Sequence, residues 1–323
     1  MKAAVIADSG VEIREVAKPT PAPNQVLVRV RAAGLNRADV IMASGRMHGS
    51  AGGPGAVLGL EFAGEVEAVG GEVTGVKPGD RVMCSGNGGY AEYAVADWGR
   101  VAKVPANNMS WEQATTLPIA LQTMHNALVT AGRLKPGETV MIQGASSGVG
   151  LMGLQIAKLK GARLVMGTST NAARRARLQE FGADLAIDTT QPDWAQEVLA
   201  ATDKKGVDLI VDQVSASVAN QNMKAAAVLG RIVNVGRLGG FKGEFDYDLH
   251  AMKRIDYIGV TFRTRSLEEV REIVRAMRAD LWQHVESGRL KLPIDRTFPL
   301  DKAAEALAHM RANAHFGKIV LMV

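Results

Sequence analysis

Hydrophobic and polar positions follow two different patterns along the chain. Up to about residue 117, short apolar or alternating runs at residues 2–7, 25–31, 61–69, 81–84 and 90–96 are separated by segments rich in glycine and proline. Alternation with a period of two is typical of half-buried strands, and Gly and Pro between such runs mark turns. This first part of the chain therefore predicts a partly open β-barrel made of many short strands.

After about residue 117, apolar strands alternate with amphipathic helical segments. Strands are expected at residues 139–143, 163–167, 185–188, 207–212, 231–235 and 255–262. Helices are expected at residues 149–160, 172–181, 194–201 and 218–229, and glycines that can cap a helix follow three of them, at Gly161, Gly182 and Gly230. Strands that alternate with helices predict an α/β, doubly wound parallel sheet covered by helices.

The end of the chain predicts a return to the first domain. A helix is expected at residues 267–284, and the apolar run at residues 318–323 predicts a last strand that pairs with the N-terminal part. The expected division is a discontinuous β-barrel-like catalytic domain at residues 1–118 and 264–323, and a dinucleotide-binding domain at residues 119–263.

Composition and charge exclude several classes of protein. Of the 323 residues, 47% are hydrophobic and 22% are charged, which is typical of a globular protein and argues against disorder. No apolar stretch is long enough for a membrane span, and the first apolar run is too short for a secretory signal. The net charge of +5 comes without a block of basic residues, so no nucleic-acid partner is expected. One cysteine, Cys84, allows no intrachain disulfide, and a cytoplasmic protein is expected.

A glycine-rich turn joins the expected strand at residues 139–143 to the next helix. Residues 143–150 read QGASSGVG, which departs from the strict G-x-G-x-x-G spacing. Glycines at this place let the backbone approach a pyrophosphate, whose charge the free amides and the positive end of the helix stabilise. A tight turn without a ligand is the alternative, and the long series of strands and helices around it favours the dinucleotide.

The charges about twenty residues further on favour NADPH over NADH. NAD-binding proteins carry Asp or Glu there, which accepts a hydrogen bond from the ribose 2′-hydroxyl. Residues 167–177 contain no acidic residue and three arginines, Arg174, Arg175 and Arg177. Guanidinium groups suit a 2′-phosphate, although at least one of the three is expected on a solvated helix face.

Ligands for a catalytic zinc ion are missing from the places where such a site would need them. Residues 34–39 contain no cysteine, residues 59–61 contain no histidine, and Cys84 has no partner at ligand spacing. Because zinc is held by cysteine, histidine and carboxylate groups, we expect chemistry without a metal. Cys84 is expected to be buried and inert.

Eight short motifs are spread over the whole chain. They are GLNRAD (34–39), LGLE (58–61), VKPGDRV (76–82), GYAEY (89–93), SGVG (147–150), GAD (182–184), GRLGG (236–240) and GKIVL (317–321). Together they resemble the zinc-independent quinone oxidoreductase (zeta-crystallin-like) branch of the medium-chain dehydrogenase/reductase superfamily, and within it the tumour-suppressor-inducible NADPH:quinone oxidoreductase group. The resemblance implies a GroES-like catalytic domain, a Rossmann nucleotide domain and NADPH in the cleft between them.

The resemblance also implies a set of site residues. The implied cofactor contacts are Asn36, Thr123, Ser147, Gly148, Val149, Asn171, Arg174, Gly236, Phe262, Arg263 and Lys318. Among them, residues 147–149 hold the pyrophosphate, and Asn171 and Arg174 take the places of a Ser and a Lys that hold the 2′-phosphate. Asn36 and Met47 are the implied catalytic positions, with Met47 about where a family tyrosine faces the quinone. Asp39 and Glu61 are expected to have structural roles.

The predicted activity is the reduction of a quinone by NADPH without zinc. Two alternatives stay open: reduction of a conjugated carbon–carbon double bond, as in enones or acyl-CoA thioesters, and a non-catalytic NADPH-binding protein. The proton is expected to come from water or the cofactor ribose, with His48 as a further possibility. A small-molecule substrate and no membrane partner are expected, and the open edge of the strand at residues 255–262 predicts a homodimer.

Overall fold

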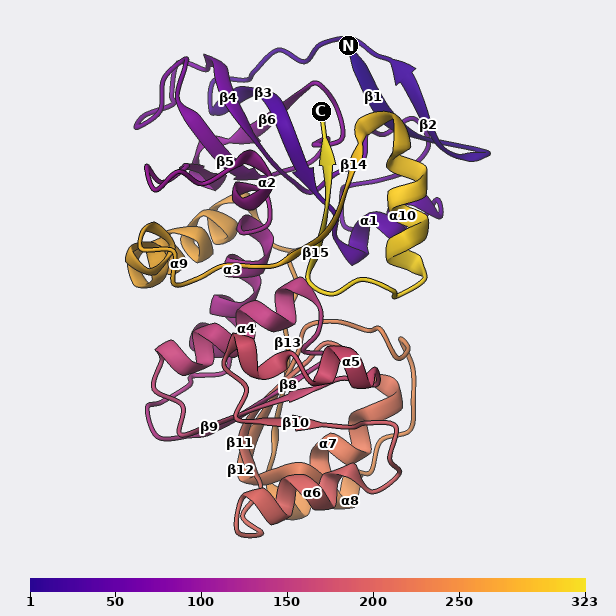
Figure 1. Ribbon diagram of the computed structural model, residues 1–323, viewed down its shortest axis with the longest axis vertical. Coiled ribbons are helices and arrows are strands. Elements are labelled where there is room, and N and C mark those ends of the chain that lie inside the picture. Colours follow the sequence, from indigo (N-terminus) through magenta and orange to yellow (C-terminus); the bar gives the residue numbers. More distant parts are fainter. The chain divides into compact units, whose positions relative to one another are not determined.

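The computed structural model describes all 323 residues, which form two compact units. Unit 1 contains Met1–Ile119 and Phe262–Val323, and unit 2 contains Ala120–Thr261 (Figure 1). Unit 2 is therefore inserted into the sequence of unit 1, and the helix α3 (Pro118–His125) contains the first boundary. None of the helices combines the length and the hydropathy needed to cross a membrane.

Unit 1 is built on a sheet of seven strands. They are β3 (Gln25–Gly34), β4 (Glu61–Val69), β5 (Arg81–Ser85), β6 (Tyr93–Asp97), β7 (Val101–Lys103), β14 (Ile294–Pro299) and β15 (Lys318–Met322). The order is β14-β15-β3-β4-β5-β7, with β6 paired to β3. The strand β15 lies antiparallel to β3, which confirms that the end of the chain returns to the N-terminal part.

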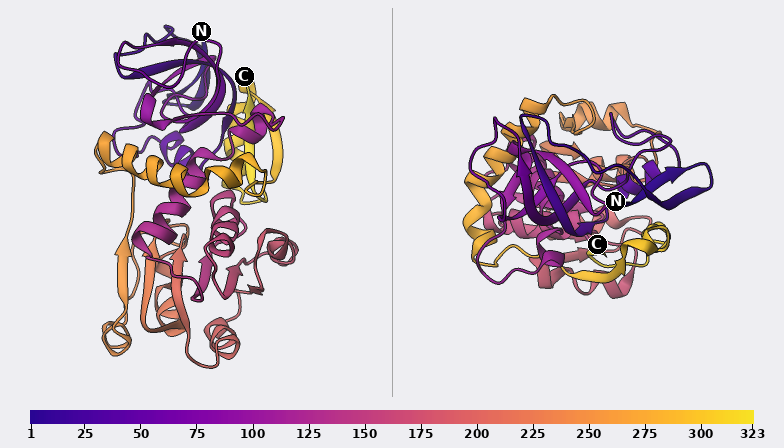
Figure 2. Two further views of the ribbon diagram at one scale, coloured as in Figure 1. Left: turned by 90° about the vertical axis from the view of Figure 1, so that its left-hand side faces the viewer. Right: turned by 90° about the horizontal axis from the view of Figure 1, so that it is seen from above.

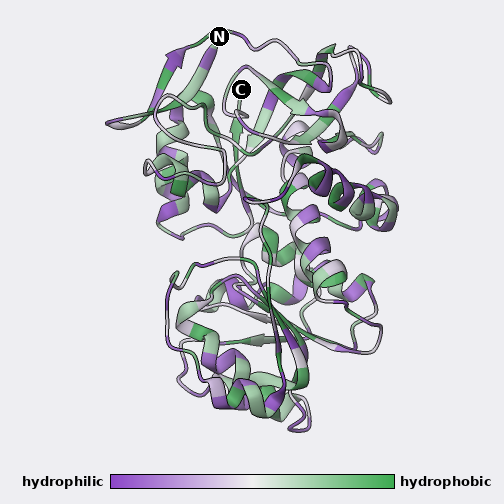
Figure 3. Ribbon diagram, turned by 180° about the vertical axis from the view of Figure 1, so that it is seen from behind, coloured by the Kyte–Doolittle hydropathy of each residue, from purple (hydrophilic) through white to green (hydrophobic).

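A hairpin and several helices complete unit 1. The hairpin consists of β1 (Lys2–Ala7) and β2 (Gly10–Glu15). The helices are α1 (Arg37–Ala43), α2 (Trp111–Ala114), α9 (Leu267–Glu286) and α10 (Ala303–Arg311), with short 3-10 turns η1 (Trp98–Arg100) and η5 (Leu300–Lys302). In α9 the buried side chains recur every three or four residues and the other face is charged, as its alternating green and purple ribbon shows (Figure 3).

Unit 2 is a parallel sheet of six strands. They are β8 (Thr139–Gln143), β9 (Leu164–Thr168), β10 (Leu185–Ile187), β11 (Val207–Asp212), β12 (Ala226–Asn234) and β13 (Asp256–Gly259). The order is β10-β9-β8-β11-β12-β13, and every neighbouring pair is parallel. From β8 the chain adds β9 and β10 toward one edge of the sheet. It then returns to β11, which lies next to β8, and adds β12 and β13 toward the other edge. Doubly wound sheets bind ligands where the strand order reverses in this way, here between β8 and β11. This topology confirms the predicted fold class.

Helices cover the sheet of unit 2 (Figure 2). They are α4 (Gly148–Leu159), α5 (Ala172–Arg175), α6 (Trp194–Ala201), α7 (Ala219–Ala225) and α8 (Tyr247–Lys253), with the π-helical turn η2 (Asn126–Ala131) and the 3-10 turns η3 (Leu178–Phe181) and η4 (Ala216–Val218). Met141 and Ile210 pack against Trp194 and Met223 on one face. Their strand neighbours are also buried, and this explains why the strands are apolar throughout.

Several predicted elements differ in extent from the structure, and the strand expected at residues 90–96 begins only at Tyr93. The helix expected at residues 218–229 ends at Ala225, because Ala226 begins β12 and pairs with Val207 of β11. Gly230 therefore lies inside a strand, next to an irregularity in the β11–β12 register, and does not cap a helix. The helix expected at residues 172–181 is split into α5 and η3, and the strand expected at residues 255–262 pairs only over Asp256–Gly259.

Candidate functional site

The turn between β8 and α4 has the geometry of a phosphate-binding turn. Ser147 caps α4, since its Oγ accepts a hydrogen bond from the backbone N–H of Gly150 at 3.0 Å. Gly144 has a φ of +70°, and a Cβ on Gly150 would lie 2.7 Å from the backbone of Ala145. Glycine is therefore required at both places, and the first N–H groups of the twelve-residue helix are left for an anion.

A chain of buried polar side chains connects this turn to the end of β11. Thr168 Oγ1 accepts from the backbone N–H of Gly144 at 3.0 Å and donates to Gln143 Oε1 at 2.7 Å. Gln143 Nε2 donates to Asn222 Oδ1 at 2.6 Å, and Asn222 Nδ2 donates to Asp212 Oδ2 at 3.0 Å. The sequence analysis missed these residues, although Gln143, Thr168 and Asp212 are polar residues that end otherwise apolar strands, which was a usable signal.

The loop after β9 holds the predicted 2′-phosphate residues. Asn171 caps α5 by accepting from the backbone N–H of Arg174 at 3.0 Å, and Ser169 Oγ donates to Ser146 Oγ of the turn between β8 and α4 at 3.3 Å. Arg175 lies 2.9 Å from Asp188, and Arg177 lies 3.2 Å from Glu180, so both of these arginines form ion pairs. The half-buried Arg174 lies in the helix that Asn171 caps.

Two further predicted contacts lie in unit 2. Gly236 follows β12, and a Cβ there would come within 2.5 Å of the carbonyl oxygen of Gln213, so the loops after β11 and β12 touch through their backbones. Thr123 is half-buried on α3.

A buried ion pair in unit 1 fixes the predicted residue Asn36. Lys318 is 3% exposed and its Nζ donates to Leu35 O at 2.8 Å, to Asn36 Oδ1 at 3.1 Å and to Glu61 Oε1. Asn36 Nδ2 donates to Glu61 Oε1 at 2.9 Å, while Glu61 Oε2 accepts from the backbone N–H of Ile119 at 2.9 Å. The three donors of Lys318 are thus all used inside unit 1, and the amide of Asn36 has one fixed orientation.

Asp39 and Tyr90 form a second buried contact beside this ion pair. Asp39 Oδ2 accepts from Tyr90 OH and from the backbone N–H of Asn36, both at 2.8 Å, while its Oδ1 has no hydrogen-bond partner. Burial raises the pKa of Asp39 to about 7, against the two hydrogen bonds and the charge of Lys318, which lower it. Burial also raises the pKa of Tyr90 well above its usual value.

The loop that carries Met47 is rich in glycines with positive φ. They are Gly45, Gly49, Gly52, Gly53 and Gly55. Met47 is 55% exposed, and His48 pairs with Ala51 in a short antiparallel bridge. A Cβ on Gly49 would lie 2.8 Å from the carbonyl oxygen of Arg263, so the structure brings this loop and Arg263 together. Phe262, the residue before it, is half-buried.

Cys84 lies in the core of unit 1. It is fully buried, and burial raises the pKa of its thiol far above the usual range, so it is present as an inert thiol. Across the 323 residues, no three side chains of His, Cys, Asp or Glu are placed to hold a metal ion together.

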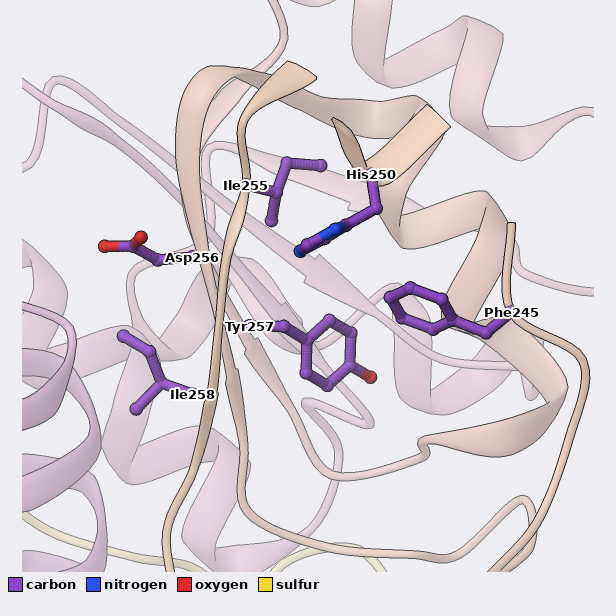
Figure 4. A pocket seen from close by; sticks show the side chains of 6 residues that line it. All are labelled: Phe245, His250, Ile255, Asp256, Tyr257 and Ile258. Carbon is purple, nitrogen blue, oxygen red and sulfur yellow. The ribbon is translucent and has the colours of Figure 1, made fainter. Parts of the chain in front are cut away.

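A cavity of about 540 Å³ lies beside the edge strand β13 (Figure 4). Its aromatic side chains turn toward one another: the ring centroid of Phe245 is 5.4 Å from that of His250 and 5.6 Å from that of Tyr257. Asp256 and Ile258 point to the opposite side of the strand from Tyr257 (Figure 4). None of the predicted cofactor contacts lines this cavity.

Both units match known protein families. Residues 22–106 match the alcohol dehydrogenase GroES-like domain, and residues 148–279 match the zinc-binding dehydrogenase domain. The chain is 30% identical to the human quinone oxidoreductase over 312 residues, which cover 96% of this chain and 92% of that protein. It belongs to the quinone oxidoreductase family of the medium-chain dehydrogenase/reductase superfamily. The predicted family and the two predicted folds are thereby confirmed.

Other members of this superfamily are similar to a comparable degree. The chain is 32% identical over 313 residues to a phenolphthiocerol/phthiocerol polyketide synthase of Mycobacterium tuberculosis, of whose length it spans 14%. The quinone oxidoreductase of Pseudomonas syringae pv. Tomato DC3000 superposes with a TM-score of 0.88 at 29% identity over all of both chains. The CurK enoyl reductase superposes with a TM-score of 0.87 at 26% identity over 99% of both. These relations support an oxidoreductase that uses a nicotinamide cofactor and acts on a small molecule.

Proposed function

We propose that this oxidoreductase reduces a quinone with NADPH and without a metal ion. The observation that carries the choice of cofactor is the loop after β9, where Asn171 and Arg174 lie in a stretch, residues 167–177, that contains no acidic residue. Through Ser169 and Ser146 this loop is hydrogen-bonded to the turn that would bind the pyrophosphate. A carboxylate is missing where NAD would need it, and guanidinium chemistry suits a 2′-phosphate.

In this proposal the residues of the chain bind, orient and shield the reactants. The turn at residues 144–150 binds the pyrophosphate, and Arg174 pairs with the 2′-phosphate. Asn36, which Lys318 and Glu61 hold in place, lies at the nicotinamide end, so Lys318 acts through Asn36. Thr123, Gly236, Phe262 and Arg263 remain proposed contacts.

Chemistry is then mainly a matter of placement. NADPH supplies the hydride when it is bound. The loop with Met47 covers a planar acceptor with an apolar side chain and keeps water away from it, which favours transfer between correctly placed partners. A quinone needs no Lewis acid, because its reduction restores an aromatic ring. Hydride transfer leaves a hydroquinone anion, which then takes its proton from water or from the ribose of the cofactor.

Arg174→Ala tests the cofactor. We expect the dissociation constant for NADPH, measured by calorimetry, to rise about tenfold to a hundredfold, as for a lost charge-assisted hydrogen bond, while that for NADH stays unchanged. Arg177→Ala is the matched control, because Arg177 is paired with Glu180. Equal losses for NADPH and NADH in Arg174→Ala would contradict a contact with the 2′-phosphate.

The acceptor is tested by following NADPH oxidation with 1,4-benzoquinone and, separately, with an enone. The similarity to the CurK enoyl reductase favours reduction of a conjugated double bond as the second candidate. Turnover of the quinone supports the proposal. Turnover of the enone alone would replace it, and NADPH binding without either turnover would indicate a binding protein.

We also propose that the protein is a homodimer. The strand β13 pairs with β12 on one side and has an open edge on the other. The aromatic cavity with Phe245 and Tyr257 adds apolar surface beside this edge. An open edge invites pairing, and pairing of two β13 strands around a two-fold axis would extend the sheet through both protomers.

A further inference from the structure

Gln213 is the first residue after β11, and its side chain reaches the turn between β8 and α4. Its Nε2 donates to the carbonyl oxygens of Gln143 at 3.1 Å and of Gly144 at 3.3 Å. Its Oε1 accepts from Ser147 Oγ at 3.2 Å. A single side chain, 6% exposed, thus contacts the first residues of the turn and the residue that caps α4.

The contact with Ser147 decides where the hydroxyl of that residue lies. Ser147 Oγ accepts from the backbone N–H of Gly150 at 3.0 Å and has two acceptors for its one proton, Gly144 O at 3.1 Å and Gln213 Oε1. All three contacts require the same position of Oγ. Gln213 therefore stabilises the rotamer of Ser147 that caps α4, at a helix start whose first N–H groups have no acceptor within the helix.

Gln213 is itself held from the opposite side. Asp212 Oδ1 accepts from the backbone N–H groups of Val214 at 2.7 Å and Ser215 at 2.9 Å, which fixes the backbone directly after Gln213. The carbonyl oxygen of Gln213 accepts from the backbone N–H of Leu238 at 3.1 Å, in the loop after β12. Hydrogen bonds on both sides of Gln213 thus fix the backbone from which its side chain reaches the turn.

We propose that Gln213 is a positioning residue for the dinucleotide. It keeps the turn at residues 144–148 in the shape that receives the pyrophosphate, and it couples that turn to the loop after β12. The inference rests on the proposed binding of a dinucleotide, and Gln213 acts on it through Ser147 and Gly144. The neutral amide matters, because a carboxylate in its place would keep the acceptor, lose both donors and bring a negative charge toward the phosphates.

Gln213→Met tests the inference, because it removes the donors and the acceptor at nearly constant size. We expect the dissociation constant for NADPH, measured by calorimetry, to rise about tenfold, as for the loss of one or two hydrogen bonds. Binding of 2′-phospho-ADP-ribose, which keeps the pyrophosphate, should weaken by the same factor. Binding of 2′-AMP, which lacks the pyrophosphate, should not change. At saturating NADPH, kcat should stay within about twofold.

Gln213→Glu is the second variant, and it keeps the size and the acceptor. It should weaken NADPH binding more than Gln213→Met does, because of its charge. The control is Gln221→Met, which removes another glutamine of unit 2 whose Nε2 donates to Pro192 O at 2.8 Å on the surface. It should bind NADPH as the wild type does. Melting temperatures of all variants show whether the folded state is kept.

Three outcomes would contradict the inference. Unchanged NADPH binding in both Gln213 variants shows that the turn keeps its shape without this side chain. An equal loss for 2′-AMP and NADPH shows a general loss of structure. If the wild type itself binds neither NADPH nor NADH, the proposed function fails first and takes the inference with it, so the two failures are distinguishable.

Discussion

Asp39 is a carboxyl group that the fold keeps away from water. Its environment in unit 1 contains Tyr90, Lys318 and Glu61, and burial is the largest influence on its pKa, which it raises from 3.8 to about 7. One of its oxygens has no hydrogen-bond partner. The protonated form is therefore favoured in the folded protein over a range of pH in which the unfolded chain is already ionised.

This difference predicts how stability depends on pH. Below about pH 4, Asp39 is protonated in both states, so its contribution is fully present. As the pH rises toward 7, the unfolded chain loses the proton first, and the free energy of unfolding falls by up to roughly 4 kcal/mol. Asp39→Asn does not titrate, so its stability relative to the wild type should rise over this range in urea unfolding. A constant difference between pH 4 and 7 would show that Asp39 has an ordinary pKa.

Single residues of the site were predictable where their role depends on neighbours in the sequence. The turn at residues 143–150 and the arginines after β9 could be found because a phosphate site uses consecutive backbone N–H groups and a nearby loop. The roles of Gln213 and Asn222 depend on β11 lying beside β8, which no local pattern shows. The ion pair of Glu61 and Lys318 likewise joins residues far apart in the chain.

At the scale of elements, the accuracy of prediction depended on how clearly a run of residues favours one structure. The strands β4, β8 and β11 and the helix α6 lie where the sequence predicts them, since their apolar pattern fits only one structure. Residues 226–229 are alanine, valine and leucine, which suit a helix or a buried strand. In the structure Ala226 begins β12 and pairs with Val207 of β11, so tertiary structure overrides the local preference for a helix.

An ion pair between Arg271 and Asp97 anchors the helix α9 to the end of the strand β6. Arg271 donates to Asp97 at the end of β6 through Nε at 2.9 Å and Nη2 at 2.6 Å. Asp97 is 9% exposed and also accepts from Asn24 Nδ2 and the backbone N–H of Gly99. Burial alone would raise the pKa of Asp97, but these hydrogen bonds and the charge of Arg271 keep it below its usual value.

Arg271→Leu should therefore destabilise the protein by about 3 kcal/mol at pH 7, because it leaves a buried carboxylate without its cation. The stabilisation that comes with the lowered pKa of Asp97 is fully present above the usual value of 3.8 and is lost as Asp97 becomes protonated at lower pH. The destabilisation caused by Arg271→Leu should therefore shrink as the pH falls below about 4. The control is Arg275→Leu, which removes an exposed pair with Glu272 and should cost less than about 1 kcal/mol. Urea unfolding at pH 7 and below pH 4 measures each variant, because urea does not screen charges as a salt does. Equal effects of the two substitutions would show that the Asp97 contact adds nothing.

At the scale of the whole molecule, the open edge of β13 predicts the state of assembly. The wild type at micromolar concentration should have the mass of two chains in light scattering. Ile258→Lys places a charge on the edge strand and should give the mass of one chain. Leu267→Lys, at an exposed apolar position that begins α9 in unit 1, should stay dimeric. A wild type with the mass of one chain would contradict the proposed homodimer.

The position of β15 between β14 and β3 also sets the order in which the protein can be completed during synthesis. The strand β3 ends at Gly34 and β15 begins at Lys318, so a ribosome adds the 283 residues 35–317 between them. At about 5 to 20 residues per second, this takes roughly 14 to 60 seconds. The whole of unit 2 emerges within that interval and is free to fold. The strand β6 covers residues 25–29 on one side of β3, but residues 32–34 on that side stay unpaired until β15 arrives, and such an exposed strand edge invites pairing with other chains.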